Sequence, residues 1–414
     1  MRIGIIIGRI GGVDGVALET VKWMDVLKKM GHKVFVMSGE FEDWNEIKYK
    51  HYRYPILSFF SPDAEWEQKR AFFMPDDKPE PLLEHIENTS SQISNKLEKW
   101  IISKKIDCLL SENASALPSH ISMGVGIKKA VEKTGINTVT HDHDFHWERG
   151  DRYKSIHPEI NQLIDDSFPL RLPYVKHAVI NTYGVDTLKK RFNIDAVNVP
   201  NVMDFSKPFG VPNEKNNKFF RKFGVRKNDI ALLQVTRIVR RKGIETAISL
   251  LDKLQDKNIK LVITGNYKDD ENRAYSSELM EMIHDLKLSS QVIPIAHEVL
   301  VHDHLSDVYA HGTACTYFST YEGFGNAFIE SVLAKKPIFV NNYKPVYMPD
   351  IGSKGFKTVM LENSKLTDTK VKKMAEIIYN PDLAEEIGEY NFELGKKHFS
   401  YEVLEEKLTE LFSF

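Results

Sequence analysis

Short apolar runs alternate with helix-like segments along this chain, and that alternation constrains the fold more than any other feature. Residues 3–7 form an apolar run that stops at a glycine, and a Gly-rich segment then leads into a helical pattern at 16–30. A second apolar run follows at 33–37. Parallel strands joined by crossover helices are buried on both faces, so they read as continuous apolar runs. We therefore expect an α/β fold built on doubly wound parallel sheets.

The alternation stops near the middle of the chain and then restarts. Further strands of the first series are expected at 106–110, 137–140, 177–181 and 196–199. Residues 205–217 are rich in Pro, Gly and Asn and are typical of a linker. Strands of the second series are expected at 230–235, 259–263, 291–295, 313–318 and 337–340, and the tail from 367 to 412 has a largely helical pattern. The sequence predicts two Rossmann-like domains, at 1–205 and 206–399, facing each other across a cleft.

Residues 41–80 fit this pattern poorly. They are rich in aromatic and charged residues and contain several prolines. We interpret them as an irregular insertion that hangs over the cleft.

The composition excludes several classes of protein. The 414 residues are 42% hydrophobic and 28% charged, with a net charge of −2, which argues against a disordered chain and against a nucleic-acid or membrane partner. Residues 1–8 read as a buried first strand, not a signal peptide. Cys108 and Cys315 lie in apolar runs without the spacing of a metal or redox motif, which suits a cytoplasmic protein.

A Gly-rich loop at 8–15 follows the first expected strand. Glycines allow backbone N–H groups to approach an anion, and the helix that follows adds its N-terminal dipole. Gly11 and Gly12 are therefore candidates for a phosphate or sugar contact. The alternative is a turn that only lets the strand and helix pack.

A basic turn comes directly after the strand expected at 230–235. It contains Arg237, Arg240, Arg241 and Lys242, just before a helix that begins at 243. Cations beside a helix N-terminus are unfavourable unless an anion lies between them. We interpret the turn as a diphosphate site on which Arg237 and Lys242 converge, although a solvated basic turn would give the same pattern.

Two carboxylates lie eight residues apart in the segment 322–330. Glu322 falls on the loop after the strand at 313–318, and Glu330 falls within the helix expected at 326–334. An ionised carboxylate can accept hydrogen bonds from two hydroxyls at once, which suits sugar recognition. The alternative for Glu330 is an exposed helix residue.

A run of His and acidic residues at 140–149 follows the strand at 137–140. Strand alternation places His141 and His143 on one side, which resembles a metal cluster, but ligands usually come from several elements and no partner cluster is evident. We interpret the run as a polar wall for a hydroxylated or phosphorylated acceptor. The residues expected to bind the acceptor are Glu112, Asn113, Asp142, His143, Asp144, Arg149 and Arg152.

Together these segments resemble the retaining, nucleotide-sugar-dependent glycosyltransferases of family 4, which have the GT-B fold. The likeness covers essentially the whole chain. It rests on the Gly-rich loop, on residues 201–204, on Arg237 with the Lys-Gly pair at 242–243, and on the E-x7-E spacing from Glu322. The family's usual Asn-Gly-Val-Asp is Asn-Val-Met-Asp at 201–204 here. The resemblance also implies that a C-terminal helix at 400–414 packs back on the first domain.

The resemblance implies a role for individual residues. Arg237 and Lys242 would neutralise the diphosphate leaving group, and His141 would lie beside the transferred sugar. Glu330 would bind the ribose hydroxyls, and Glu322 would lie near the donor sugar. The donor-binding residues expected in all are Gly11, Gly12, Phe324, Gly325, Asn326 and Glu330. The family is metal-independent, so neither a bound metal nor another cofactor is expected to be essential.

The implied activity is transfer of a hexose from GDP-mannose or UDP-glucose to a small soluble acceptor carrying a phosphate or carboxylate. Glucosyl-phosphoglycerate and sugar phosphates are examples, as in synthases of the sucrose-phosphate and mannosylglucosyl-phosphoglycerate types. The family is thought to use front-face attack. Base recognition is expected around 293–298. The alternatives are a sugar phosphorylase, a nucleotide-sugar epimerase or a non-catalytic nucleotide-sugar sensor.

Overall fold

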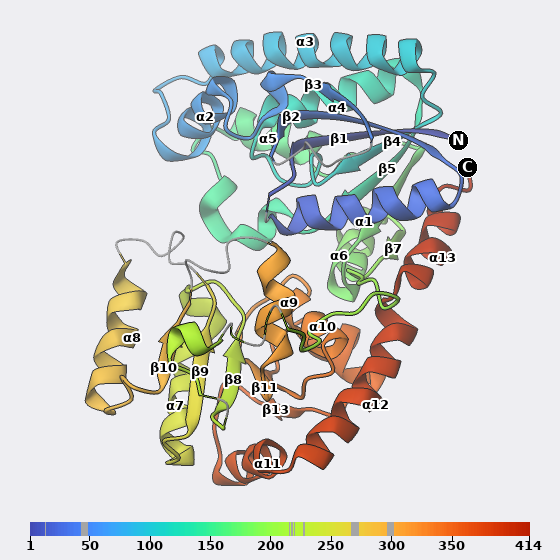
Figure 1. Ribbon diagram of the computed structural model, residues 1–414. Helices are drawn as coiled ribbons and strands as arrows, with labels where there is room; N and C mark the ends of the chain where they lie inside the picture. The colour runs from blue at the N-terminus through green and yellow to red at the C-terminus, as the bar shows by residue number, and fades with distance from the viewer. Residues whose placement is uncertain are drawn as a thin grey trace. The chain divides into compact units, whose positions relative to one another are not determined.

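The computed structural model describes residues 1–12, 14–42, 49–214, 216, 218, 220–226, 228–265, 273–295 and 302–414. The chain divides into two compact units (Figure 1): residues 1–200 together with 404–414, here called unit 1, and residues 201–403, here called unit 2. Each unit contains one sheet of parallel strands joined by helices. The expected α/β fold with two Rossmann-like units is therefore confirmed.

Unit 1 contains a seven-stranded parallel sheet in the order β3-β2-β1-β4-β5-β6-β7. Its strands are β1 (Arg2–Ile10), β2 (Lys33–Phe41), β3 (Lys50–Arg53), β4 (Cys108–Glu112), β5 (Asn137–Asp142), β6 (Val175–Val179) and β7 (Ala196–Asn198). Its helices are α1 (Gly15–Lys29), α2 (Pro62–Gln68), α3 (Glu80–Lys104), α4 (Ile121–Thr134), α5 (Pro158–Ser167), α6 (Thr182–Phe192) and α13 (Tyr401–Leu411). The strand order places β4 and β5 side by side at the centre.

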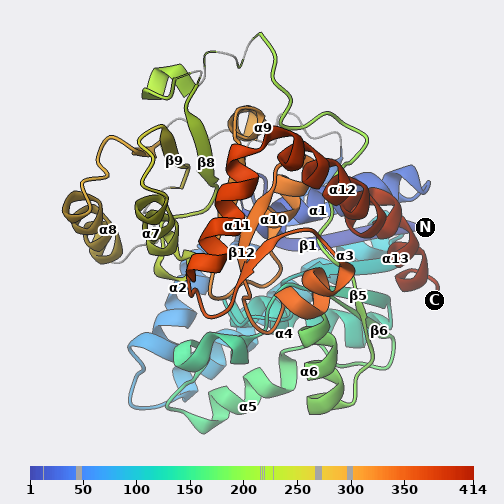
Figure 2. The ribbon, with the colours of Figure 1, turned by 90° about the horizontal axis from the view of Figure 1, so that it is seen from below.

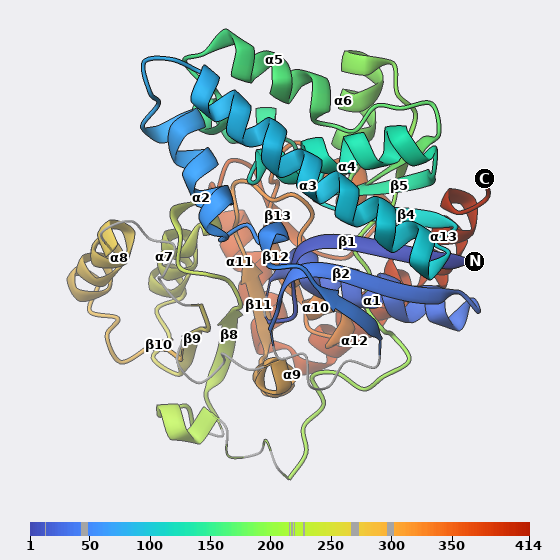
Figure 3. The ribbon, with the colours of Figure 1, turned by 90° about the horizontal axis from the view of Figure 1, so that it is seen from above.

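Helices cover both faces of this sheet. Figures 1 and 3 show α3 and α4 on one face and α1 on the other. Leu97 and Trp100 of α3 and Ile127 of α4 pack on Ile6 and Leu109 from the central strands. Each side chain of this size contributes about 1.5–3 kcal/mol when it is fully buried. The core therefore holds the central strand ends in fixed positions.

Residues 49–80 are more regular than the sequence suggested. They contain β3, α2 and a π-helical stretch at Lys69–Phe73, so the expectation of an irregular insertion is wrong for this part; residues 43–48 lie outside the described residues. Glu67 of α2 has no exposed surface and accepts a hydrogen bond from Ser122 N (3.0 Å) in the first turn of α4. A carboxylate distant in sequence thus caps α4, which ties this region to the sheet.

The helix α13 packs against unit 1. Residues 404–414 belong to that unit. Leu404, Leu408 and Leu411 are buried. Lys176 of β6 donates a hydrogen bond to Ser413 O (2.6 Å), and Lys29 of α1 forms an ion pair with Glu405 (3.1 Å). The expected C-terminal helix is present, and the packing boundaries fall at 200/201 and 403/404.

Unit 2 contains a six-stranded parallel sheet in the order β10-β9-β8-β11-β12-β13. Its strands are β8 (Ile230–Gln234), β9 (Ile259–Ile263), β10 (Val292–Pro294), β11 (Ala314–Tyr317), β12 (Ile338–Asn341) and β13 (Val359–Leu361). Its helices are α7 (Ile244–Leu254), α8 (Ala274–Asp285), α9 (His302–Ala310), α10 (Asn326–Leu333), α11 (Asp368–Tyr379) and α12 (Pro381–Phe399). Figure 2 shows α12 beside α10, against which it packs.

The candidate residues lie where these strands end. β8 and β11 are neighbours, so the basic turn after β8 and the loop after β11 meet at one edge of the unit 2 sheet. Ligands of open α/β sheets bind outside the carboxyl ends of the strands. Within the described part of the chain, no helix is both long enough and apolar enough to cross a bilayer.

Candidate functional site

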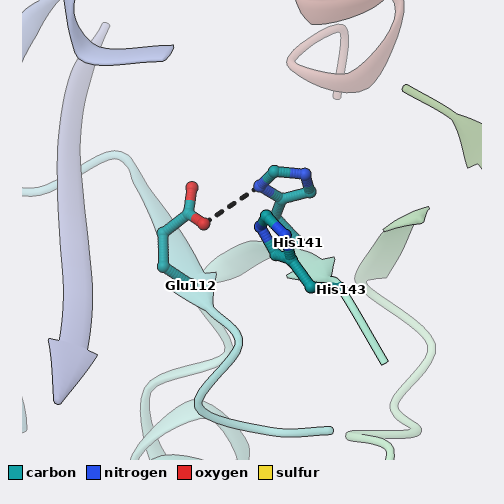
Figure 4. A group of neighbouring side chains, drawn as sticks. All are labelled: Glu112, His141 and His143. Carbon is teal, nitrogen blue, oxygen red and sulfur yellow. Dashed lines mark hydrogen bonds and ion pairs between the residues drawn. The ribbon is translucent and has the colours of Figure 1, made fainter. Parts of the chain in front are cut away.

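In unit 1, Glu112 and His141 end two neighbouring strands. They are register partners in the parallel pair of β4 and β5, so both side chains lie at the same edge of the sheet. Glu112 Oε2 and His141 Nδ1 are hydrogen-bonded at 3.0 Å (Figure 4), and neither residue has exposed surface. The pairing of β4 with β5 thus brings His141 into contact with Glu112, which lies 29 residues earlier in the chain.

His141 contacts two aromatic rings. Trp23 of α1 stacks on it with a centroid distance of 4.0 Å and an interplanar angle of 22°. The ring of His143 lies 4.4 Å from that of His141, as strand alternation predicted. The Nε2 atoms of both histidines are buried and have no hydrogen-bond partner among the described residues. Buried polar atoms are almost always paired in proteins, so these two nitrogens are candidates for ligand contacts.

Burial favours the uncharged forms of the groups in this cluster. It raises the pKa of Glu112 well above its usual value, an effect that a hydrogen bond from the Thr20 side chain opposes. It lowers the pKa of His141 to about 3 and that of His143 well below its usual value. Asp142 has a pKa raised to about 7 by burial, despite a hydrogen bond from Thr140 (2.8 Å). Burial therefore favours uncharged hydrogen-bonding groups at Glu112, His141 and His143, whereas Asp142 titrates close to neutral pH.

The same three residues also satisfy a geometric test for a metal site. Within the described part of the chain, Glu112, His141 and His143 are the group whose potential ligand atoms all lie within 4.8 Å of one another. The hydrogen bond between Glu112 and His141 accounts for the closest of these approaches without an ion. The geometry is thus compatible with either a metal or a hydrogen-bonded polar cluster.

The other expected acceptor residues are spread around this cluster. Asn113 accepts a hydrogen bond from His143 N (3.1 Å), so it shapes the turn after β5. Asp144 forms an ion pair with Arg149, whose side chain is half exposed. Arg152 is exposed, with its guanidinium 5.6 Å from the Tyr153 ring centroid. The structure thus brings Asn113 and His143 together, and it pairs one of the two arginines with an acid of the same run.

The Gly-rich loop after β1 packs against the end of β2. Gly11 and Gly12 have positive φ angles of 94° and 65°. A Cβ at Gly11 would overlap the carbonyl oxygen of Glu42, and one at Gly12 would overlap the carboxylate of Glu42. The close approach of Glu42 therefore accounts for glycine at both positions of this turn. Their contact with a donor remains a prediction.

In unit 2, a buried carboxylate bridges two cations. Glu322 accepts one hydrogen bond at Oε1 from the Lys242 ammonium and one at Oε2 from the Arg241 guanidinium, the second at 2.9 Å. Both loops are joined by their backbones, since Thr320 N donates to Arg241 O (2.8 Å). Lys242 and Glu322 are both buried. The convergence of Arg237 and Lys242 on a diphosphate stays a prediction: burial and, less strongly, the positive charge of Arg237 lower the pKa of Lys242, and Glu322 joins Lys242 to Arg241.

This bridge carries excess positive charge. Burial lowers the pKa of Lys242, and Glu322 opposes that effect. Burial alone would raise the pKa of Glu322, but the charges of Lys242 and Arg241 outweigh it and hold that pKa below its usual value. Two cations thus share one carboxylate, and the exposed Arg237 lies just beyond β8. The arrangement can hold an anion with more than one negative charge.

Glu330 lies on α10, within the loop-then-helix segment that the sequence predicted. Its Oε2 accepts a hydrogen bond from Tyr309 of α9 (3.0 Å). Gly325 precedes α10 with a φ of 130°, and a Cβ there would overlap the Tyr343 hydroxyl. Asn326 accepts a hydrogen bond from the Asn201 side chain (2.7 Å). These contacts fix the start of α10, where free backbone N–H groups favour anions.

The Phe324 side chain is buried in the core of unit 2. It packs edge-on against Phe399 of α12, with a centroid distance of 5.6 Å. Only its backbone can therefore contact a donor. Of the region expected to read the base, residues 296–298 lie outside the described residues.

Sequence reasoning missed the aromatic residues around these sites. Trp23 lies on a helix with an ordinary amphipathic pattern, and Tyr309 lies in a short helix of mixed composition. Tyr317 ends β11, and the Lys242 ammonium lies 5.4 Å from its ring centroid. The residue types alone gave no signal, because aromatic side chains are also common in protein cores.

Comparisons with known proteins agree with this chemistry. A model of the family described as Glycosyl transferases group 1 matches residues 215–394. The mannosylglucosylglycerate synthase of Thermotoga maritima is 32% identical, over 99% of this chain and 99% of its own length. The corresponding synthase of Petrotoga mobilis is 28% identical, over 96% and 98%.

Solved structures show the same fold. A glycosyltransferase from Rickettsia africae matches 99% of this chain and 97% of its own, with a TM-score of 0.73 and 17% identity. Anabaena HepE, solved with UDP-glucose, matches 100% and 99% with a TM-score of 0.70 and 13% identity. Sucrose-phosphate synthase from Thermosynechococcus elongatus matches 100% and 98% with a TM-score of 0.65 and 13% identity. The chain therefore belongs to the group 1 glycosyl transferases, and it is a glycosyltransferase enzyme with the GT-B fold.

Proposed function

We propose that this enzyme transfers a mannosyl residue from GDP-mannose to glucosylglycerate and so forms mannosylglucosylglycerate. The observation that carries the proposal is the 32% identity to the Thermotoga maritima synthase of that name over 99% of both chains. The acceptor is small and carries a carboxylate, in keeping with the sequence-based expectation of a carboxylated or phosphorylated acceptor.

The bridge in unit 2 supports a role for that unit in holding the nucleoside diphosphate. The leaving diphosphate gains negative charge as the bond to the sugar breaks, so preplaced cations stabilise the transition state more than the ground state. Lys242 and Arg241 are held by Glu322, and Arg237 supplies a further exposed cation. Glu330 would accept the ribose hydroxyls while Tyr309 orients it.

The same cations make an essential divalent metal unnecessary in this proposal. In metal-dependent transferases the ion neutralises the diphosphate, whereas here three basic side chains would do so. EDTA-treated enzyme should then keep its turnover. Activity that disappears with EDTA and returns with Mg²⁺ or Mn²⁺ would contradict this part of the proposal.

The proposed reaction retains the configuration of the sugar by front-face attack. The acceptor hydroxyl oxygen attacks C1 of the mannosyl group from the face on which the diphosphate departs. The C1–O bond breaks, its electron pair leaves with GDP, and a phosphate oxygen of the departing group takes the hydroxyl proton. Trapping of a glycosyl-enzyme adduct by mass spectrometry would overturn this mechanism.

In unit 1, we assign His141 to the transferred sugar and His143, with its neighbours, to the acceptor. Their unpartnered Nε2 atoms support these assignments. Neutral imidazoles suit sugar hydroxyls, which both donate and accept hydrogen bonds.

The experiment that tests the function pairs donors with acceptors. GDP-mannose, UDP-glucose and ADP-glucose would each be incubated with glucosylglycerate, glycerate, 3-phosphoglycerate and glucosyl-3-phosphoglycerate, and products would be identified by NMR. We expect turnover of GDP-mannose with glucosylglycerate and an axial linkage retained from the donor. Exclusive use of a phosphorylated acceptor, or consumption of the donor without any acceptor, would contradict the proposal.

A further inference from the structure

The hydrogen bond between Glu112 and His141 has an unusual setting. Both side chains are fully buried, and the pair has no cation among its described contacts. In Figure 4 the Glu112 carboxylate meets one edge of the His141 ring, and the second nitrogen lies across the ring from it. That second nitrogen, Nε2, is buried and has no hydrogen-bond partner among the described residues, and the same holds for Oε1 of Glu112.

We propose that Glu112 is a positioning residue that acts through His141: it fixes the orientation of the imidazole and keeps the proton on Nε2, so that Nε2–H donates to a hydroxyl of the bound sugar. This inference rests on the proposed function, because it takes His141 as the residue that contacts the sugar. It differs from the sequence-based expectation, which placed Glu112 in direct contact with the acceptor.

The role assigned to Glu112 rests on its hydrogen bond to His141. Oε2 of the carboxyl group contacts Nδ1 of the imidazole, and both Oε1 of Glu112 and Nε2 of His141 are buried without a hydrogen-bond partner among the described residues. Trp23 closes one face of the imidazole at 4.0 Å, and Thr20 of the same helix reaches the carboxyl group. The ring is therefore held on its face by α1 and on its edge by β4.

The position of the proton follows from the chemistry of the pair. A neutral imidazole carries one proton, on either Nδ1 or Nε2. If Glu112 were ionised it would accept a hydrogen bond from Nδ1–H, and Nε2 would be an acceptor. If Glu112 is protonated, its O–H donates to Nδ1, and Nε2–H is left as a donor. Burial favours the uncharged carboxyl, in agreement with its strongly raised pKa.

The carboxamide of glutamine separates this role from a need for negative charge. In Glu112→Gln the side-chain NH₂ can donate to Nδ1 as the carboxyl O–H does, so the Nε2–H form is preserved. In Glu112→Leu the shape is approximately kept, but nothing orients the ring or selects the proton position. We expect the Gln variant to keep kcat within about threefold and the Leu variant to lose about 100-fold, as for other misplacements of a reacting group.

The proton position is read directly by NMR of ¹⁵N-histidine-labelled protein, with His141 assigned from the signal missing in His141→Phe. Wild type and Glu112→Gln should show His141 protonated on Nε2, and Glu112→Leu should show a mixture of both forms. The matched control is Glu67, a buried carboxylate of the same unit that caps α4 instead. Glu67→Gln and Glu67→Leu should change the melting temperature and leave the His141 signals where they are.

Several results would overturn the proposal. One is a folded Glu112→Leu variant with unchanged kcat and an unchanged His141 spectrum. Another is a Glu112→Gln variant as inactive as the Leu variant, because the carboxylate charge would then be required. A third is a stoichiometric transition metal in the purified protein whose removal shifts the His141 signals, because Glu112 would then be a ligand. The NMR comparison stands even if no donor and acceptor pair gives product, so failure of the proposed function is recognised separately.

Discussion

Two buried carboxylates at strand ends, one in each unit, have opposite electrostatic settings. Glu322 lies in the loop after β11 and bridges Lys242 and Arg241, whose charges keep its pKa low. Glu112 ends β4 and, among the described residues, forms hydrogen bonds with the His141 imidazole and the Thr20 side chain, and burial raises its pKa. Burial is nearly complete in both places, so the partner decides the charge state.

The difference matches the chemistry that each unit is proposed to perform. A buried ion pair with a surplus cation suits a diphosphate that departs with growing negative charge. A neutral pair suits sugar hydroxyls, which need donors and acceptors but no counter-charge. Removing a cation from the Glu322 bridge in unit 2 tests this difference between the two units. Changing the pH tests how burial and ionic partners act on buried carboxyl groups.

The largest effect is expected when Lys242 is replaced by Met. The variant removes a preplaced cation from the bridge and leaves Glu322 with Arg241 alone, so kcat should fall by about 10²–10³-fold, equivalent to about 3–4 kcal/mol. Steady-state kinetics and calorimetric titration with GDP would measure the loss. Lys335→Met is the matched control, since Lys335 pairs with Glu389 at the surface of the same unit. Equal losses of kcat in the two variants would contradict the assignment of Lys242 to the diphosphate site.

The next effect concerns stability and pH. Burial raises the pKa of Glu67 to about 7 in the folded protein, against 4.5 ordinarily, so its favourable contribution is complete below about pH 4.5 and is lost as the pH rises through about 7. Glu67→Gln should therefore gain stability relative to wild type as the pH rises, by up to about 3 kcal/mol. Chemical denaturation at several pH values would measure this gain, and a pH-independent difference would contradict it.

Glu322 should show the opposite slope. Its folded-state pKa is lowered, so its contribution is present above the ordinary pKa and is lost as the pH falls through the lowered value. The difference in stability between wild type and Glu322→Gln should thus shrink on acidification. Denaturation curves collected alongside those of Glu67→Gln would show how each stability difference changes with pH. Changes of the same sign for both residues would contradict the prediction.

A smaller effect is expected for Arg237→Ala. This exposed cation lies beyond β8 and contributes little to folding, so turnover should fall by about tenfold while the melting temperature stays within the range of neutral surface changes. Kinetics and thermal denaturation of the same preparation test both halves of the statement. A variant that unfolds while its remaining folded fraction turns over normally would show that Arg237 is structural.

The smallest effect is expected for Tyr309→Phe. The variant removes the hydroxyl that donates to Glu330, so a carboxylate proposed to bind the ribose loses its orientation. Loss of one such hydrogen bond is worth about 1 kcal/mol, or about fivefold in GDP affinity. Calorimetry would measure the change, and unaltered affinity would separate Glu330 from the nucleotide.

The alternation of strands and helices was predictable because buried parallel strands leave long apolar runs. The helix α3 was missed, although Ile86, Ile93, Leu97 and Trp100 recur at helical spacing, because polar residues fill most of its other positions. The region after residue 49 was misjudged for another reason. Its contacts come from distant parts of the chain: β3 pairs with β2, and Glu67 accepts a hydrogen bond from Ser122, 55 residues away.

The candidate residues could be assigned to strand ends, but their partners could not. Glu112 meets His141 only because β4 and β5 are neighbours in register. Lys242 meets Glu322 only because β8 and β11 are neighbours, although the two residues are 80 positions apart. Which cation of the basic turn points inward depends on the 3₁₀ turn at Arg240–Lys242, which residue type alone does not reveal.

The return of α13 to unit 1 has a consequence for how the chain folds during synthesis. Unit 2 is one continuous segment, so all of its residues are available once residue 403 has left the ribosome. Unit 1 is translated first, yet its buried Leu404, Leu408 and Leu411 are made last. The order of translation is therefore the reverse of the order in which the two units can be completed, because the apolar side chains that finish unit 1 follow all of unit 2 in the chain.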